Sequence, residues 1–93
     1  GQASAINGQI VGTVLDASGS TVSGATVRIL NTNTGFTQEA QTESSGLYRF
    51  GLLPLGNYEV TAQAPGFSVA KRVGIPVNAG ATVTIDFALA VSA

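Results

Sequence analysis

The sequence predicts an all-β protein, a seven-stranded β-sandwich built from antiparallel or mixed sheets. Three observations predict it: turn-forming residues recur at short intervals, the segments between them alternate apolar and polar residues, and χ1-restricted residues are abundant, with ten Val, ten Thr and five Ile. No segment keeps the helical period of 3.6 for a dozen residues. A single sheet would leave half of the apolar faces in water, whereas two sheets packed face to face bury them.

Turn-forming residues divide the chain into short segments. Glycine adopts a positive φ at little cost, and Asn or Asp side chains imitate a backbone turn. The clusters are Asp16-Ala17-Ser18-Gly19, Asn31-Thr32-Asn33-Thr34-Gly35, Ser44-Ser45-Gly46, Gly56-Asn57, Pro65-Gly66 and Asn78-Ala79-Gly80. The intervals between them have the length of strands rather than of helices.

Period-two alternation then gives the strands in order. The predicted strands are 8–16, 25–31, 36–43, 47–50, 57–64, 67–78 and 81–91. Residues 36–43 are mostly polar, as in an edge strand, and Pro76 places residues 67–78 at an edge or a bulge. The alternation predicts a core of Val14, Val27, Ile29, Tyr48, Phe50, Leu53, Tyr58, Val60, Val83, Ile85 and Phe87. Residues 1–7 are predicted to be a flexible leader and residues 8–91 a single domain.

The composition excludes several classes of function. The chain has 93 residues, 10% of them charged, a net charge of −1, and no Cys, His, Met or Trp. Without imidazole or thiol groups, we predict no catalytic site, no cofactor, no disulfide and no metal site. The balanced charge offers no field for nucleic acid. The longest apolar run, residues 87–91, is too short to insert into a membrane.

The turn and core residues together form a pattern that resembles a known family. The pattern consists of Gly12-Thr13-Val14-Leu15-Asp16, Val22-Ser23-Gly24-Ala25-Thr26-Val27, Asn31, Thr34-Gly35, Thr42, Gly46-Leu47-Tyr48-Arg49-Phe50, Leu53-Pro54-Leu55-Gly56-Asn57-Tyr58-Glu59-Val60 and Ala64-Pro65-Gly66-Phe67. Over residues 8–90 it resembles the carboxypeptidase regulatory-like domain family, prealbumin-like (transthyretin-like) sandwiches related to Cna B-type modules. Leu55 departs from it, since the family often has a second Pro there.

The resemblance implies a non-catalytic accessory, structural or docking module of an extracytoplasmic bacterial protein, in the periplasm, at the outer membrane or on the cell surface. The version that it resembles most is the N-terminal domain of TonB-dependent outer-membrane receptors. A carbohydrate-binding module, a stalk module of a surface adhesin and the regulatory-like domain of a peptidase stay open as alternatives. Expected partners are the other domains of the parent protein and a protein strand paired to the edge at 36–43 or 67–78.

Motifs with catalytic spacing have simpler interpretations here. Residues 19–24 match half of a P-loop, but the Lys and the following helix are missing. Glu39 and Glu43 lie about 13 Å apart along a strand, too far for paired acid catalysis, which needs about 5–9.5 Å. Asp16 and Asp86 could meet across strands, and Asp16 with two serines resembles a partial calcium loop. A turn cap explains Asp16 better, because the loop has too few carboxylates.

Two further hypotheses depend on single residue types. The related Cna B-type modules carry an intramolecular isopeptide bond from a Lys on the first strand, but the only Lys here is Lys71, predicted to be an exposed edge charge. Sugar binding needs exposed aromatic rings. Four of the six aromatic residues fall on core faces, which leaves Phe36 and Phe67 as the candidate ligand or docking contacts. A glycan platform requires both to be exposed together.

Overall fold

The computed structural model describes residues 6–92, and over that range it contains strands and turns without a helix. Its strands are β1 (Asn7–Asp16), β2 (Thr26–Asn31), β3 (Thr37–Gln41), β4 (Leu47–Pro54), β5 (Gly56–Gln63), β6 (Ala70–Val77), β7 (Thr82–Thr84) and β8 (Phe87–Leu89). The predicted all-β class is confirmed. In this range there is accordingly no apolar helix of membrane-spanning length. The predicted leader lies mostly outside the described residues, and its last residue, Asn7, begins β1.

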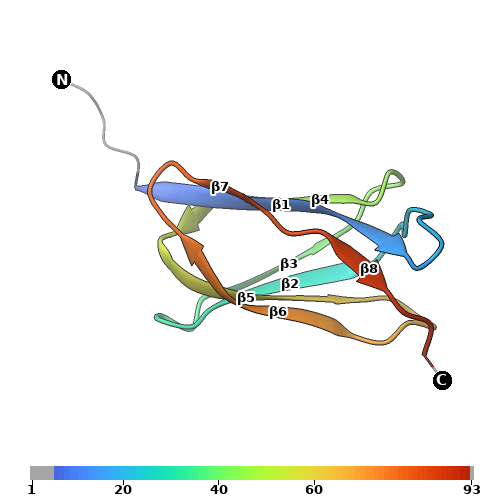
Figure 1. Ribbon diagram of the computed structural model, residues 1–93. Coiled ribbons are helices and arrows are strands. Elements are labelled where there is room, and N and C mark those ends of the chain that lie inside the picture. Colours follow the sequence, from blue (N-terminus) through green and yellow to red (C-terminus); the bar gives the residue numbers. More distant parts are fainter. Residues whose placement is uncertain (1–5, 93) are drawn as a thin grey trace.

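Two sheets pack face to face (Figure 1). The first has the order β4-β1-β7, with β8 also paired to β1, and the second has the order β3-β2-β5-β6. β1 is antiparallel to β4 but parallel to both β7 and β8. All neighbours in the second sheet are antiparallel. The predicted sandwich of mixed sheets is therefore confirmed, and β3 and β6 are edge strands as their sequences indicate.

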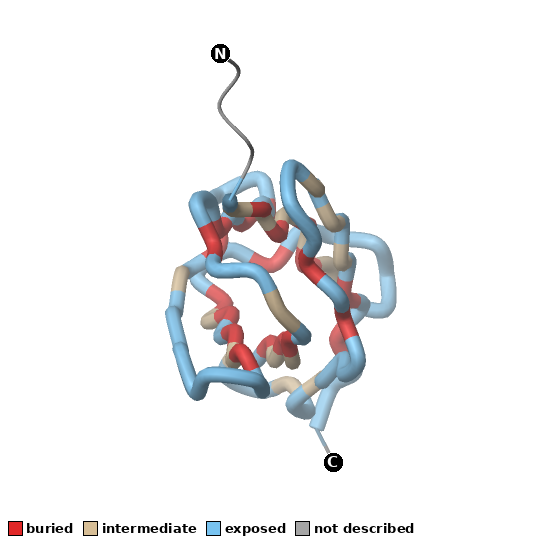
Figure 2. Tube along the Cα trace, turned by 90° about the vertical axis from the view of Figure 1, so that its left-hand side faces the viewer, coloured by how far each residue is buried: buried red, intermediate tan, exposed pale blue. Residues whose placement is uncertain are grey.

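The core lies between the two sheets, where buried segments of the chain face one another (Figure 2). The residues of β5 from Tyr58 to Ala62 alternate between buried and half-buried positions, as period two requires. Nine of the predicted core residues are buried: Val14, Val27, Ile29, Tyr48, Phe50, Leu53, Tyr58, Val60 and Phe87. The other two, Val83 and Ile85, are only half-buried and pack against the margin of the core. They lie on and beside β7, a three-residue strand at the edge of its sheet.

The last predicted strand, residues 81–91, is divided in two, so the described residues form eight strands rather than seven. The division falls at Ile85 and Asp86. The Asp86 carboxylate Oδ1 accepts a hydrogen bond from the Thr13 amide at 2.9 Å, and the Tyr48 hydroxyl donates to the Ile85 carbonyl. The Asp86 carboxylate and the Tyr48 hydroxyl thus satisfy one backbone group of β1 and one of the link between β7 and β8, where the ladder is interrupted.

A buried polar corner closes the end of the sandwich where β5 begins. Tyr58 is fully buried, and its hydroxyl donates to the Pro54 carbonyl at 2.6 Å. The fully buried Asn31 donates through Nδ2 to the Leu55 carbonyl at 3.2 Å, and its Oδ1 accepts from the Asn33 and Thr34 amides. These bonds hold the β2–β3 and β4–β5 turns together, because leaving such buried groups without partners would be costly.

The adjacent small residues Gly24 and Ala25 predict that one strand starts close to its neighbour at this point. Ala25 is fully buried, in agreement with that expectation, but a Cβ on Gly24 would meet open space. The φ of Gly24 is 72°, a left-handed conformation that side chains rarely adopt. The backbone turn, rather than crowding, therefore selects glycine at this position.

Candidate docking site

Phe36 lies in the turn between β2 and β3, at the end of the sandwich that holds the Asn31 corner. Its side chain is 37% exposed. The Phe36 carbonyl accepts a hydrogen bond from the Asn31 amide at 2.8 Å, so the turn that ends β2 fixes its backbone. Phe36 is therefore an accessible aromatic ring on an anchored turn.

Phe67 lies at the opposite end of the sandwich. It follows the end of β5, is half-buried against the core, and forms an antiparallel bridge with Val91. β2 and β5 are paired from Asn31↔Tyr58 to Thr26↔Gln63, so the two phenylalanines lie beyond opposite ends of that pairing. This pairing is five residue steps long, so the two phenylalanines lie at least about 17 Å apart. The structure thus does not bring Phe36 and Phe67 into one aromatic platform.

The acidic residues of the first sheet have separate structural positions. The Asp16 carboxylate Oδ1 accepts hydrogen bonds from the Ser18 hydroxyl at 2.6 Å, the Ser18 amide at 2.8 Å and the Ser20 amide at 3.0 Å. These bonds, the Ser18 hydroxyl first, lower the pKa of Asp16 below its ordinary value. The turn cap predicted for Asp16 is confirmed, whereas Asp86 binds Thr13 instead. Among residues 6–92, no three side chains of metal-ligand type form a group.

Tyr48 carries the one hydroxyl with a strongly perturbed pKa in the described chain. Burial raises this pKa, the nearby Asp86 raises it further, and Arg72 lowers it. A phenol that is protonated throughout the physiological range acts here as a hydrogen-bond donor to Ile85. Arg72 completes this margin of the sandwich: its guanidinium lies 5.6 Å from the centre of the Phe87 ring and donates to the Asp86 carbonyl at 3.3 Å.

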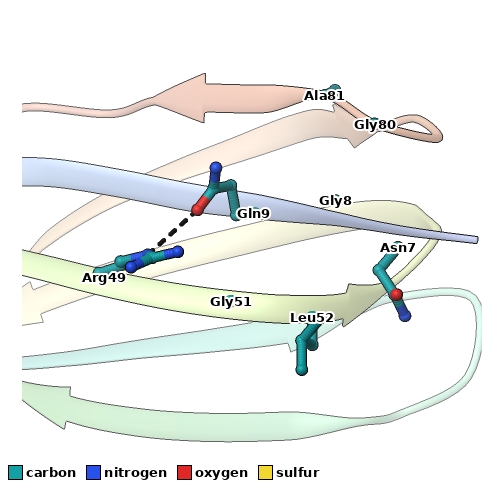
Figure 3. Close-up of a pocket in the computed structure, with 8 residues that line it drawn as sticks. All are labelled: Asn7, Gly8, Gln9, Arg49, Gly51, Leu52, Gly80 and Ala81. Carbon is teal, nitrogen blue, oxygen red and sulfur yellow. Dashed lines mark hydrogen bonds between the residues drawn. The ribbon is translucent and has the colours of Figure 1, made fainter. Parts of the chain in front are cut away.

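A shallow hollow of about 260 Å³ lies where β1 passes β4 and the turn before β7 (Figure 3). Its charged member is Arg49, whose Nε donates to the Gln9 side chain at 3.1 Å. Leu52 stands at its rim, 82% exposed and with a φ of 53°. The lining residues are Asn7, Gly8, Gln9, Arg49, Gly51, Leu52, Gly80 and Ala81. Amides, glycines and one cation provide neither a nucleophile nor a base.

The free edges of the second sheet differ in their surroundings. On β6, Lys71 is exposed, as the sequence predicts, and its Nζ lies 3.4 Å from a carboxylate oxygen of Glu59. On β3, every residue except the half-buried Ala40 is exposed. The sequence predicts both segments as edges, residues 36–43 from their polarity and residues 67–78 from Pro76. Which of the two edges is regular enough to accept another strand depends on how each strand pairs with its neighbour.

Comparison with known proteins supports the same fold. The family model described as "carboxypeptidase regulatory-like domain" matches residues 9–90. A search of curated proteins found no match. The similar solved structures include three of which the chain covers less than two thirds.

The first is a candidate carbohydrate-binding protein from Bacteroides uniformis, with 20% identity over 89% of this chain and 41% of that one, and a TM-score of 0.69. The second is the Bacillus anthracis TIE protein, with 28% identity, coverage of 94% and 17%, and a TM-score of 0.73. The third is the wild-type catechol 1,2-dioxygenase of Acinetobacter radioresistens, with 12% identity, coverage of 96% and 53%, and a TM-score of 0.77. The first and third likenesses establish the fold alone.

Proposed function

We propose that this chain is a non-catalytic accessory and docking module of an extracytoplasmic bacterial protein. The premise is its family: the chain belongs to the carboxypeptidase regulatory-like domain family. The parent that we propose is a TonB-dependent outer-membrane receptor, with this module on its N-terminal side in the periplasm or at the outer membrane. In this role the module acts by position, as a rigid spacer that also offers a docking surface to neighbouring proteins.

The observation that carries the proposal is the placement of the first and last strands. β8 runs parallel to β1, with Leu89 opposite Asp16 at the far end of β1 from Asn7. The chain therefore enters the sandwich at one end and leaves it at the other (Figure 1). Nine residue steps of strand separate these ends by about 30 Å. Such a module extends a longer polypeptide end to end, whereas a module with adjacent ends would branch from it.

The chemistry of the described residues also supports a positional role. The carboxylates Asp16 and Asp86 cap backbone amides, the Tyr48 hydroxyl is a buried donor, and the hollow beside Leu52 contains no acid or base other than Arg49. These three polar groups therefore hold the sandwich together.

The parent protein can be identified directly. An antibody against the folded chain would be used to isolate the intact polypeptide from fractionated cells, and flanking peptides would be sequenced by mass spectrometry. We expect the outer-membrane fraction and flanking peptides of a plug and barrel. A cytosolic location would contradict the proposal, and flanking peptidase or cell-wall anchor sequences would support the alternative parents.

The spacer geometry has its own measurement. The chain contains no Cys, so the variant carrying Ile6→Cys and Ala90→Cys takes spin labels at those two positions alone. Pulsed dipolar spectroscopy should give a distance of about 30 Å, the length of β1. A distance below about 20 Å, hence two chain ends on the same side of the sandwich, would be inconsistent with an in-line module.

A further inference from the structure

The sheet edges formed by residues 6–92 are protected to different degrees against pairing with another strand. β6 has a bulge in which Val73 and Gly74 face the single residue Glu59, and it also contains Pro76 and the cation Lys71. Bulges, prolines and lysines are the devices by which proteins prevent edge pairing. This edge is therefore closed to an added strand over most of its length.

The two edges of the first sheet are interrupted as well. In β4, Gly51 and Leu52 together face the single residue Gln9, and Leu52 has a left-handed backbone. On the other side, β7 and β8 are three residues each, separated at Asp86. Neither edge presents a regular row of hydrogen-bonding groups longer than a few residues.

β3 is different, because its five residues pair with β2 in one unbroken register, from Thr26↔Gln41 to Leu30↔Thr37. The amide of Asn31 donates to the Phe36 carbonyl, and the amide of Thr42 donates to the Ala25 carbonyl. Hydrogen bonding in an antiparallel ladder alternates, so the backbone groups of Thr37, Glu39 and Gln41 point away from β2. A regular row of three amides and three carbonyls therefore faces outward.

The charge of this edge selects the kind of strand that fits it. Glu39 is the central residue of β3, and Arg28 of β2 lies opposite it on the inner flank. Glu39 itself is exposed. A basic residue on an added strand would place Glu39 between two cations, whereas an acidic residue would face a like charge. Full antiparallel pairing of β3 with a second copy of this chain would set Glu39 against Glu39, which disfavours a homodimer at that register.

We infer that β3 is the docking edge of this module and accepts an extended segment of a partner protein, antiparallel to β3, with a Lys or Arg opposite Glu39. The inference rests on the docking role proposed above. It is tested on the isolated 93-residue chain, so its outcome does not depend on which parent protein carries the module. Alternate residues of the segment would be small and apolar where they meet the sandwich margin beside Ala40, and polar on the outer face beside Thr37 and Gln41.

The test is a titration of the 15N-labelled chain with two synthetic peptides at low ionic strength, followed by NMR. The peptides are acetyl-Thr-Val-Lys-Val-Thr-amide and its counterpart with Glu in place of Lys. We expect chemical-shift changes and slowed hydrogen exchange at the Thr37, Glu39 and Gln41 amides. The Lys peptide should bind about fivefold to tenfold more tightly than the Glu peptide, the size of effect that one cross-strand charge pair produces.

Three variants separate backbone pairing from charge. Glu39→Pro removes an outward amide that β2 does not use, so it should abolish binding of both peptides while the chain stays folded. Glu39→Lys keeps the amide and should reverse the preference between the peptides. Lys71→Glu makes a charge change on the opposite edge strand, β6, and should leave the preference unaltered.

The remaining results would overturn the inference. Binding to the Glu39→Pro variant at wild-type strength, or shifts confined to β4 or β6, would exclude β3 as the docking edge. Equal affinity for both peptides would exclude the basic partner. A dimer of the unmodified chain in analytical ultracentrifugation that Glu39→Pro dissociates would identify a second copy, rather than a partner protein, as the occupant.

Discussion

The contribution of Tyr58 to stability can be divided between its ring and its hydroxyl. The side chain is fully buried, and the hydroxyl donates to the Pro54 carbonyl at 2.6 Å across the β4–β5 turn. Tyr58→Phe keeps the ring and removes this bond, which should lower the free energy of unfolding by about 1 kcal/mol. Tyr58→Ala also removes the ring and leaves a cavity, and its cost should be about 3–5 kcal/mol.

These values are large for a chain of this size, whose free energy of unfolding is expected to lie at about 5–14 kcal/mol. Urea denaturation followed by far-UV circular dichroism would measure both variants, with an unchanged m-value confirming that the two-state transition is preserved. Tyr48→Phe serves as a matched control, because it removes the hydroxyl of the other buried tyrosine, in a different part of the sandwich. If Tyr58→Ala cost no more than Tyr58→Phe, the ring would not be the anchor of this corner and the reasoning would fail.

Three further predictions follow from the backbone. Gly12→Ala should destabilise the chain by about 3 kcal/mol or more in the same denaturation assay, since the new Cβ would lie 1.8 Å from the Ile85 carbonyl oxygen. A loss of free energy of unfolding below about 1 kcal/mol would contradict the close approach of β1 and Ile85. Leu52→Gly should raise the free energy of unfolding by about 0.5 kcal/mol, because it relieves the left-handed backbone of Leu52 and removes little buried area. The control variant Leu55→Gly should lower the free energy of unfolding. A destabilised Leu52→Gly variant would show that the backbone of Leu52 is not strained. Because the pKa of Asp16 is lowered on folding, its turn bonds stabilise the chain above the unfolded pKa, near 3.8, and this contribution is lost as the pH falls through the folded pKa. Thermal melting between pH 2 and pH 6 should therefore show a smaller acid-side decline for Asp16→Ala than for the unmodified chain, and parallel curves would exclude the cap.

Much of the fold could be predicted because the information is local. The alternation in β1, β2 and β5 assigns Val14, Val27 and Tyr58 to the inner faces, and Asp16 is recognisable as a turn residue from the serines and glycine that follow it. Val83 is only half-buried rather than buried as predicted. The alternation is correct there, but its strand lies at the edge of the sheet and is covered on fewer sides.

The candidate site was less accessible to sequence reasoning. Phe36 and Phe67 are the two aromatic residues that the alternation leaves off the core faces, but the alternation does not specify at which end of the sandwich each of them lies. The edge character of residues 36–43 follows from their polarity, and Pro76 indicates an edge or a bulge within residues 67–78. The position of that bulge at Gly74 depends on how β6 pairs with β5, which the sequence alone does not specify.

The sequence by itself determined the side-chain faces, the turns and the absence of thiol and imidazole chemistry, because each of these depends on a residue and its immediate neighbours along the chain. Only the tertiary structure decided that β7 and β8 run parallel to β1, that the final strand divides at Asp86, and that the chain enters and leaves at opposite ends. These features arise from contacts between residues about seventy positions apart, where the choice of partner reflects the packing of the whole sandwich rather than any local preference.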